Sequence, residues 1–367
     1  MYPQLRLHLP RLEANIAATA RWCSAAGADW WPHIKTTMCR PVVERQLAAG
    51  ASVVTVATVG QAAIAAHWGC ARLLVANEVV NPADLDQLAR LARSATVMLL
   101  VDSAAGIAAA DKAAVAAGVR LNVFVDVGRP GGRTGVRDAR AAVDVAQRVR
   151  AARGLRLVGV SAYEGAVPPR RDEQTLQIVD EHCRLAAEVF LDVIGFADTG
   201  TPVFTAGGSA FPDRVLEACG PVRAVPGAMI ALRPGCSTIH DHGLYERVSP
   251  IPGLAAAVTI RGQVLSAPEA GLVVVGAGKR DLPYDADLPT VVGAWDPKGR
   301  SRKGGAAEVT ELYDHHAVLR VEEAGPTVGD LVDFGVSHPC GAFDRWPTIT
   351  VVDDDGSVLD EWSTQFR

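Results

Sequence analysis

The first two-thirds of the chain alternates short apolar runs with longer segments in which apolar residues recur at helical spacing. The apolar runs have the length of buried strands, and polar or Gly-rich residues bound them. Strands that alternate with helices predict a parallel sheet, and eight strands fit a closed (β/α)₈ barrel. The eight runs are Asp29–Lys35, Ser52–Thr58, Arg72–Asn77, Thr96–Asp102, Arg120–Gly128, Arg156–Gly165, Val203–Gly208 and Val222–Ile230.

Between these runs, four alanine-rich segments predict helices. They are Pro82–Arg93, Ser103–Ala117, Val136–Arg153 and Asp172–Phe190. An open doubly wound sheet is the alternative architecture for such an alternation. No GxGxxG follows the first strand, which favours the barrel.

The pattern changes near Pro250, where apolar residues begin to recur at every second position. Clusters of Gly, Pro and Asp separate these runs, and convincing helical patterns are absent. We therefore expect an α/β barrel over residues 10–247 and an antiparallel β domain over residues 248–367. The strand-like residues 1–9 are expected to join the β domain. The period-two runs are Ala257–Ile260, Gly271–Val275, Ala317–Val321 and Thr348–Val352.

The composition of the chain excludes several classes of protein. Hydrophobic residues make up 49% and charged residues 21%, as in ordinary globular enzymes. The net charge of −5 argues against nucleic acid or an anionic membrane as a partner. We expect no signal peptide and no membrane span. The 7 cysteines are scattered without a CxxC pair, which predicts no disulfide framework and a reducing cytoplasm.

The segment Pro32-His33-Ile34-Lys35-Thr36-Thr37 places a lysine where we expect the first strand to end. Active sites of such barrels lie at the carboxyl ends of the strands. Apolar and aromatic neighbours would remove water from the amine, lower its pKa and free its lone pair for Schiff-base chemistry. A solvated surface lysine is the alternative for Lys35, and a buried structural histidine is the alternative for His33.

Three further features are expected on the same edge of the barrel. Arg133 lies in the glycine-rich loop after the fifth run, and Tyr163 ends the sixth. Gly207 and Gly208 end the seventh run, and Ser209 follows them before a short predicted helix, a pattern typical of phosphate sites. The alternative for Arg133 is an exposed surface residue, and the alternative for Tyr163 is an aromatic residue that closes the barrel core. The alternative for Gly207 and Gly208 is an ordinary tight turn.

A phosphate site together with a desolvated lysine and an aromatic hydroxyl suggests pyridoxal phosphate bound to Lys35. Barrel aldolases that form Schiff bases also use a lysine, but their lysine usually lies on a later strand. Those aldolases need no second β domain either.

In the predicted β domain, His338 and Cys340 are two positions apart, so on an extended segment they point to the same side. Nitrogen with sulfur suits Zn²⁺ best, with Mn²⁺ or Mg²⁺ as alternatives. A buried cysteine beside a turn histidine is the structural alternative. Two further clusters, His240-Asp241-His242 and His315-His316, could bind metal or lie in polar loops. We expect loop positions for His242 and His315, and the sequence does not decide between the two roles for Asp241 and His316.

Seven motifs occur in order along almost the whole chain: PHIKTT, DVGRPGGRTGV, YEG, TAGGSAF, LRPGCSTIHD, GAGKRD and SHPCGAFDRW. In these motifs the chain resembles the D-serine dehydratase/D-threonine aldolase group of fold-type III, alanine-racemase-like pyridoxal-phosphate enzymes. The resemblance implies Lys35 as the lysine that binds the cofactor. It also implies cofactor contacts from Arg133, Tyr163, Gly207, Gly208 and Ser209, a metal held by His338 and Cys340, and a homodimer. We expect a further cofactor contact from His33.

The resemblance further implies a lyase that acts on small D-β-hydroxy amino acids. We expect dehydration of D-serine, D-threonine or a 3-hydroxy-D-aspartate-like substrate to a 2-keto acid and ammonia, because related aldolases tend to carry Asp where Cys340 stands. Retro-aldol cleavage to glycine and an aldehyde is the first alternative. An amino-acid racemase and a protein that binds the cofactor without catalysis are further alternatives. The family's usual residues differ here at Trp31, Thr37, Met38, Gly341 and Ala342, which leaves the substrate side chain open.

Overall fold

A computed structural model describes residues 2–302, 307–322 and 325–366 of the chain. The residues form two compact units, and each is described here by itself. One unit comprises residues 19–35 and 46–235, and it is called the barrel unit below. The other comprises residues 1–18, 36–45 and 236–366, and it is called the β unit.

Eight parallel strands form the barrel unit, and each strand pairs with the next in the chain from β3 to β9. The last strand, β9, pairs in turn with β2. An isolated parallel bridge between His33 and Thr55 joins β2 to β3, with Thr55 N donating to Pro32 O at 2.9 Å, so the sheet closes. The strands are β2 (Asp29–Trp30), β3 (Val54–Val56), β4 (Arg72–Glu78), β5 (Thr96–Val101), β6 (Leu121–Val127), β7 (Leu155–Ala162), β8 (Val203–Ala206) and β9 (Met229–Leu232).

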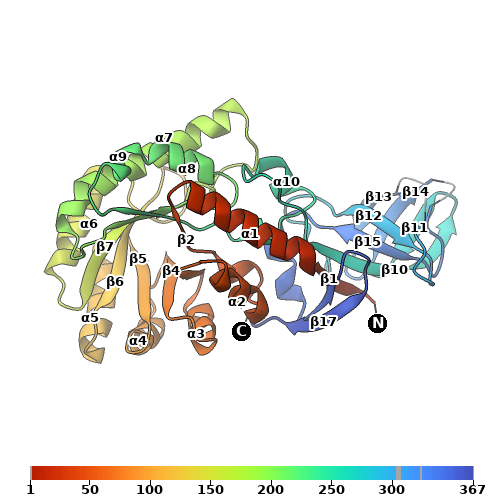
Figure 1. Cartoon of the computed structure of the whole chain (residues 1–367), viewed down its shortest axis with the longest axis horizontal. Helices are drawn as coiled ribbons and strands as arrows, with labels where there is room; N and C mark the ends of the chain where they lie inside the picture. Colours follow the sequence, from red (N-terminus) through yellow and green to blue (C-terminus); the bar gives the residue numbers. More distant parts are fainter. Residues whose placement is uncertain (1, 303–306, 323–324, 367) are drawn as a thin grey trace. The chain divides into compact units, whose positions relative to one another are not determined.

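Helices connect consecutive strands and lie around the outside of the sheet (Figure 1). Their starts follow from the sequence, since Ser103, Asp138 and Asp172 each accept a backbone N–H of the first turn. The helices are α3 (Val59–His67), α4 (Pro82–Leu91), α5 (Ala104–Ala117), α6 (Ala139–Ala151), α7 (Glu173–Val193), α8 (Pro212–Ala218) and α9 (Gly220–Arg223).

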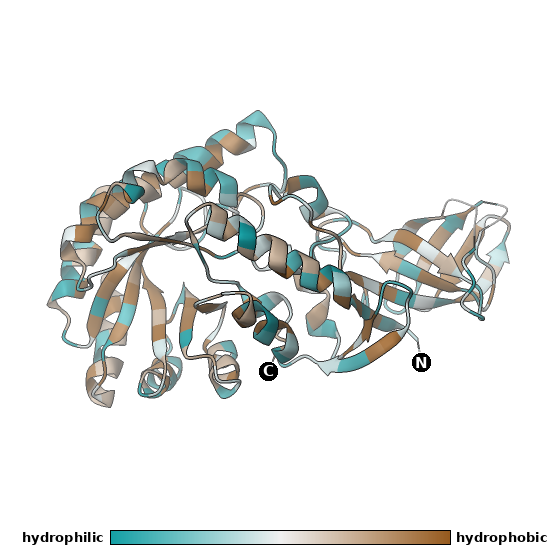
Figure 2. Ribbon diagram, in the orientation of Figure 1, coloured by the Kyte–Doolittle hydropathy of each residue, from teal (hydrophilic) through white to brown (hydrophobic). Residues whose placement is uncertain are grey.

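The interior of the barrel is filled by apolar side chains from several strands. Phe124 and Trp31 pack edge to face with ring centroids 6.3 Å apart. Figure 2 shows the barrel strands largely hydrophobic and the helix α7 with mixed hydrophobic and hydrophilic residues. This pattern explains why strands buried on both faces appear in the sequence as continuous apolar runs.

The predicted (β/α)₈ barrel is confirmed, with two corrections to its strands. The first strand ends at Trp30, and Lys35 lies beyond it in the 3₁₀ turn η1 (Ile34–Thr36). Pro32 has no N–H for a sheet hydrogen bond, which limits the strand there. The predicted run Val222–Ile230 is also wrong at its start, since Gly220–Arg223 is helical with proline in its first turn. The strand follows at Met229–Leu232.

The β unit is built on a mainly antiparallel sheet in the order β13-β14-β11-β10-β1-β16-β17, with β12 and β15 joined to it through β10. The N-terminal strand β1 lies inside this sheet, antiparallel to β10 and parallel to β16. The strands are β1 (Gln4–His8), β10 (Val258–Glu269), β11 (Leu272–Val275), β12 (Thr290–Trp295), β13 (Ala307–Leu312), β14 (Ala317–Val321), β15 (Leu331–Gly335), β16 (Thr348–Val352) and β17 (Val358–Ser363).

Short helical segments complete the β unit. They are α2 (Arg40–Ala48), most of which belongs to this unit, α10 (Leu244–Val248), and the 3₁₀ turns η3 (Cys236–Thr238), η4 (Pro339–Gly341) and η5 (Phe343–Arg345). Helix α1 (Leu9–Ala25) contributes residues to both units. Within the described residues, no helix combines the length and the apolar character needed to cross a membrane.

Candidate active site

Lys35 lies on the carboxyl side of β2, directly after the bridge that closes the barrel. Its side chain is half-buried, and the neighbouring Trp31 and Ile34 are each 1% exposed. In the described part of the chain the Lys35 amine has no hydrogen bond and no ion pair. An amine with apolar neighbours and no partner is available to attack a carbonyl carbon.

His33 lies two residues before Lys35, and its Nδ1 is buried with no hydrogen-bond partner in the described ranges. Burial holds the pKa of His33 well below its ordinary value, and the nearby charges of Lys35, Arg233 and Arg133 lower it further. The imidazole is therefore neutral at neutral pH. Three cations act on one ring, so positive charge converges on this part of the barrel rim.

Arg233 follows β9 and is 6% exposed. Its guanidinium donates to Thr205 O and Thr205 Oγ1, both at 3.0 Å, to Ser161 Oγ at 3.3 Å and to Ala162 O at 2.6 Å. Burial lowers the pKa of Arg233, while the charges of Glu164 and Asp126 raise it. Four acceptors fix this cation at the carboxyl ends of β7 and β8.

Glu164 occupies the amides of the twin-glycine loop. Gly207 N donates to its Oε2 at 3.1 Å, and Gly208 N donates to its Oε1 at 2.7 Å. Burial raises the pKa of Glu164, and these amides and Arg233 lower it. The two amides expected to face a phosphate thus bind a carboxylate of the chain itself, which fixes the loop that leads to Ser209.

Both glycines of this loop are needed for close packing. Gly207 has φ +80°, in the left-handed region that favours glycine. A Cβ on Gly208 would lie 3.0 Å from Cε2 of the Tyr163 ring. Ser209, the next residue, is 7% exposed. The backbone after β8 is therefore held against Tyr163 and Glu164.

Tyr163 and Arg133 lie together at the exposed margin of the site, with the Arg133 guanidinium carbon 5.1 Å from the centre of the tyrosine ring. Tyr163 is 42% exposed. The loop that carries Arg133 is anchored by two carboxylates, because Thr134 Oγ1 donates to Asp126 at 3.0 Å and Gly135 N donates to Asp102 at 3.0 Å. Asp126 thus braces a turn.

These barrel residues fit an anionic, aldehyde-bearing cofactor. Lys35 supplies a free amine, Arg133 and Arg233 supply positive charge, and the orphaned Nδ1 of His33 offers one more polar contact. A ligand such as pyridoxal phosphate requires an amine for its aldehyde and cationic or N–H groups for its phosphate.

A second group of polar side chains lies within the β unit. Cys236 Sγ and Cys340 Sγ are 3.2 Å apart, and Thr36 Oγ1 lies 3.4 Å from the first and 3.3 Å from the second. Both cysteines are free thiols; Cys236 is buried and Cys340 is partly exposed. The chain links the two groups directly, since Lys35 precedes Thr36 and Gly235 precedes Cys236.

His338 stands next to Cys340 in an unusual backbone conformation with φ +70°. Its N–H donates to Asp241 Oδ2 at 2.9 Å, and a 2.5 Å hydrogen bond joins its Nδ1 to Asp285 Oδ2. Hydrogen bonding to Cys340, supported by Asp285, raises the pKa of His338 to about 9. Hydrogen bonds from Cys236 and His338 lower the pKa of Cys340, which favours its thiolate.

Nitrogen and thiolate donors are the ligands that Zn²⁺ prefers, so the donor chemistry fits the predicted metal pair. Among the described residues, however, no group of three or more His, Cys, Asp and Glu side chains is arranged so that it could hold a metal ion. Asp241 accepts N–H groups of Gly243, Tyr245 and His338, each at 2.9 Å, and so braces the loop. His316 is exposed.

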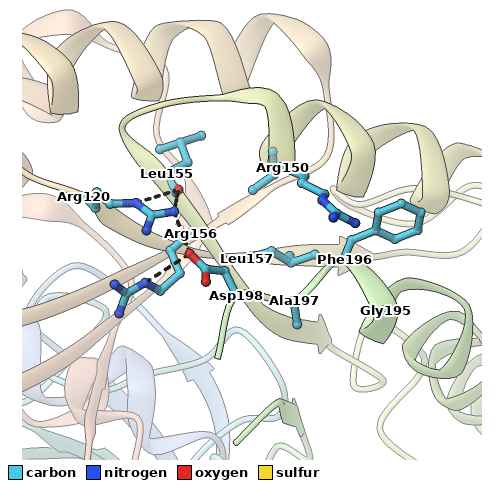
Figure 3. Close-up of a pocket in the computed structure, with 10 residues that line it drawn as sticks. Arg120, Arg150, Leu155, Arg156, Leu157, Gly195, Phe196, Ala197 and Asp198 are labelled. Atoms are coloured by element: carbon cyan, nitrogen blue, oxygen red, sulfur yellow. Dashed lines mark hydrogen bonds and ion pairs between the residues drawn. The ribbon is translucent and has the colours of Figure 1, made fainter. Parts of the chain in front are cut away.

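A cavity of about 210 Å³ lies away from these residues (Figure 3). It is lined at the amino ends of β6 and β7, where Asp198 pairs with Arg120 at 2.8 Å and with Arg156 at 3.9 Å. Because barrel chemistry takes place at the carboxyl ends of the strands, this cavity is separate from the candidate site.

Sequence reasoning missed three residues of the two groups: Glu164, Arg233 and Cys236. Glu164 and Arg233 follow strands β7 and β9, and that position is the signal that points to both. Cys236 is separated by 104 positions from Cys340, so no local spacing connects them.

The comparisons with known proteins agree with this fold. Residues 7–210 match the alanine racemase N-terminal domain, and residues 257–352 match the putative serine dehydratase domain. A D-threonine aldolase from Arthrobacter sp is 28% identical over 370 residues, which is 100% of this chain and 92% of the relative. A 3-hydroxy-D-aspartate aldolase from Paracoccus denitrificans is 30% identical over 348 residues, 92% and 84% of the two chains.

A D-threo-3-hydroxyaspartate dehydratase from Delftia sp. is 29% identical over 207 residues, 56% of this chain and 54% of the relative. Among solved structures, a D-threonine aldolase from Filomicrobium marinum superposes with a TM-score of 0.86 at 26% identity, covering 99% of this chain and 94% of that one. The chain belongs to the D-serine dehydratase/D-threonine aldolase family of alanine-racemase-like enzymes.

Proposed function

We propose that the protein is a lyase that uses pyridoxal phosphate and a divalent metal to dehydrate a small D-β-hydroxy amino acid. The products are a 2-keto acid and ammonia, after loss of water and hydrolysis of the resulting enamine. The observation that carries this proposal is the Cys340 sulfur, which contacts Cys236 and Thr36 and whose pKa is lowered beside His338. A thiolate and an imidazole together form a donor pair for a Lewis-acid metal.

Lys35 is the proposed attachment point of the cofactor, with His33, Arg133, Tyr163, Gly207, Gly208, Ser209 and Arg233 around it. When bound, pyridoxal phosphate supplies electron withdrawal that acidifies the α-carbon of the substrate. The Nζ of Lys35 would accept the α-proton of the substrate. Arg233 holds a fixed positive charge, and neutral His33 keeps one more cation away from Lys35.

His338 and Cys340 are the proposed metal ligands, with Zn²⁺ the best match to nitrogen and sulfur and Mn²⁺ or Mg²⁺ as alternatives. The metal supplies polarisation of the β-hydroxyl group, which makes it a better leaving group. Asp285 orients the His338 ring through its hydrogen bond to Nδ1. Solved variants of a D-threo-3-hydroxyaspartate dehydratase replace a histidine and, in a metal-free form, a cysteine, which supports a metal held by these residue types.

Retro-aldol cleavage is the second candidate, because two of the matched relatives are aldolases. The same residues would then promote loss of the β-hydroxyl proton and cleavage of the Cα–Cβ bond. Incubation with D-serine, D-threonine and 3-hydroxy-D-aspartate distinguishes the two reactions. Keto acid and ammonia support dehydration, whereas glycine and an aldehyde support the aldolase. Formation of the L-enantiomer that persists after chelation would identify a racemase.

The attachment of the cofactor is tested by substitution of Lys35. Lys35→Ala should abolish the visible absorbance of the cofactor Schiff base and all turnover, because no other amine takes its place. Lys279→Ala is the matched control: Lys279 is exposed and lies 6.0 Å from the centre of the Tyr284 ring. Absorbance that survives in Lys35→Ala and disappears in Lys279→Ala would contradict the proposal.

We also propose that the protein is a homodimer, as the family resemblance implies. Sedimentation equilibrium should give twice the chain mass of 38.6 kDa. A species of the chain mass itself at micromolar concentration would contradict the dimer without affecting the proposed chemistry.

A further inference from the structure

We propose that Cys236 and Cys340 form a reversible redox pair, which a hydroperoxide oxidises to an intramolecular disulfide and a dithiol reduces again. The formation of the disulfide stands on the geometry of the two residues. Its effect on activity rests on the proposed function, and nothing in the family resemblance assigns Cys236 a role. Both cysteines belong to the β unit, although 104 positions separate them along the chain.

The two sulfur atoms are in contact within the β unit. Cys236 Sγ and Cys340 Sγ lie 3.2 Å apart, and both cysteines are free thiols. A disulfide bond is about 2.05 Å long, so the two sulfurs need to approach each other by roughly 1.2 Å. Rotation about the Cα–Cβ bonds of the two side chains covers a distance of this size.

Short turns of the β unit carry both cysteines. Cys236 is the first residue of η3, and Cys340 is the middle residue of η4. Thr36 Oγ1 lies 3.4 Å from the Cys236 sulfur and 3.3 Å from the Cys340 sulfur, so one hydroxyl contacts both. A disulfide here would join two turns and leave the hydrogen bonds between the strands of the sheet in place.

The two residues differ in exposure, and this difference assigns the order of the chemistry. Cys340 is partly exposed, whereas every other cysteine of the chain is buried. A small oxidant dissolved in water therefore reaches Cys340 first, because oxidation of cysteines follows their accessibility. Cys236, buried and in contact with it, is placed as the second thiol that resolves the oxidised sulfur.

The oxidation balances with a hydroperoxide as the acceptor of two electrons. The deprotonated Cys340 sulfur attacks the terminal peroxide oxygen, the O–O bond breaks, and the leaving oxygen takes up the proton. Cys340 is then a sulfenic acid. The Cys236 sulfur attacks the Cys340 sulfur, the S–O bond breaks, and the hydroxyl leaves as water with the Cys236 proton. A dithiol reverses the reaction by thiol–disulfide exchange.

The disulfide would also change the proposed metal pair. The thiolate is the form of cysteine that binds metals, and a sulfur in a disulfide is no longer a thiolate. Oxidation would therefore withdraw Cys340 from His338 as a donor. Together with the proposed function, this predicts that turnover is lost on oxidation and regained on reduction.

The test treats the full-length protein with hydrogen peroxide and then with dithiothreitol. Of the 7 thiols that titrate in the unfolded, reduced chain, two should disappear with peroxide and return with dithiothreitol. Peptide mapping should find a cross-link between Cys236 and Cys340, with the mass of two hydrogens lost. An unchanged thiol count overturns the proposal, and so does any other product at Cys340, including a cross-link to a second chain.

Two variants test the role of Cys236 as the resolving thiol. Cys236→Ser leaves Cys340 without this neighbouring thiol, so peroxide should carry its sulfur on to the sulfinic acid, which dithiothreitol does not reduce. Thiol recovery should therefore be complete in the wild type and one thiol short in Cys236→Ser. Cys39→Ser, at a buried cysteine of the same unit, is the matched control and should form the cross-link as the wild type does. Complete recovery of the Cys340 thiol in Cys236→Ser would contradict the resolving role.

The same experiments separate this inference from the proposed function. The thiol count and the peptide map are measured without substrate, so they hold or fail independently of turnover. A Cys236–Cys340 cross-link in a protein that converts no D-β-hydroxy amino acid would keep the redox pair and contradict the lyase. An active dehydratase in which peroxide leaves every thiol titratable would do the opposite.

Discussion

The buried Glu164 carboxylate accepts N–H groups from two consecutive glycines and faces the Arg233 charge. Glu164→Gln would place an NH₂ group against one of these N–H donors and remove the negative charge that offsets Arg233. An unsatisfied buried donor costs roughly 1–3 kcal/mol, so we expect a loss of that size in the free energy of unfolding. Urea unfolding of the variant measures the loss.

Glu173→Gln is the control for this substitution, because Glu173 is exposed in the first turn of α7. It should change the free energy of unfolding by less than about 0.5 kcal/mol. Equal stability of Glu164→Gln and wild type would show that the glycine amides find other acceptors.

Glu78 ends β4 next to Asp126, and both oxygens of its carboxylate are buried. Burial, together with the charge of Asp126, raises its pKa to about 8 from 4.5. Between these two values the folded protein keeps a proton that the unfolded chain has lost. Stability should therefore fall as the pH rises from about 4.5 to about 8.

Glu78→Gln removes this titration, and the stability difference between variant and wild type should grow with pH across that range. The slope is expected to stay below ~1.4 kcal/mol per pH unit, the limit for one proton. Urea unfolding at several pH values measures it, with the exposed Glu188→Gln as control. A difference that is constant with pH would show that Glu78 is already ionised at pH 5.

At the scale of elements, the pairing of β7 with β8 depends on Gly159. Its φ is +153°, and a Cβ there would lie 1.8 Å from Val203 O on the neighbouring strand. Gly159→Ala must therefore push β8 away from β7, and β8 leads directly into the loop of Gly207 and Gly208. We expect a loss of at least ~2 kcal/mol in the free energy of unfolding.

Gly195→Ala is the matched control, because a Cβ at Gly195 meets no atom within 4 Å. It should leave the melting temperature nearly unchanged, while Gly159→Ala lowers it by several degrees. Calorimetry of both variants compares them directly. Similar melting temperatures would mean that β8 adjusts to the methyl group without cost.

The elements themselves were largely predictable from sequence, because buried parallel strands and amphipathic helices leave periodic patterns. The predicted helix Ser103–Ala117 agrees with α5 to within one residue. The pattern failed at Val222, which belongs to a short helix that begins at Gly220 and has Pro221 in its first turn. Apolar residues indicate that a segment is buried. In a segment of only four residues they do not show whether it is a helix or a strand.

The candidate site was less predictable, because its contacts join distant parts of the chain. The spacing of His338 and Cys340 is local, so sequence alone suggested a metal pair. Cys236 approaches Cys340 only through the fold, and the partner of the Gly207 and Gly208 amides comes from the end of β7. No local sequence pattern predicts such contacts, because they depend on the topology of the fold.

At the scale of the whole molecule, the residues proposed to hold the cofactor and those proposed to hold the metal belong to different compact units. Lys35, Arg133 and Arg233 lie in the barrel unit, whereas Cys340 and His338 lie in the β unit. Removal of the metal should therefore abolish turnover of D-β-hydroxy amino acids and leave the cofactor bound. A chelator added to the holoenzyme, with turnover and visible absorbance recorded on the same sample, tests this separation.

His338→Ala should reproduce the effect of the chelator, with absorbance retained and turnover lost, because the substitution removes a proposed metal ligand from the β unit only. Addition of Zn²⁺ should restore the chelated wild type and fail to restore the variant. His316→Ala is the matched control, since His316 is exposed in the same unit and should keep full activity. Loss of the cofactor absorbance on chelation would show that the metal also supports cofactor binding, which would contradict a division of the two tasks between the units.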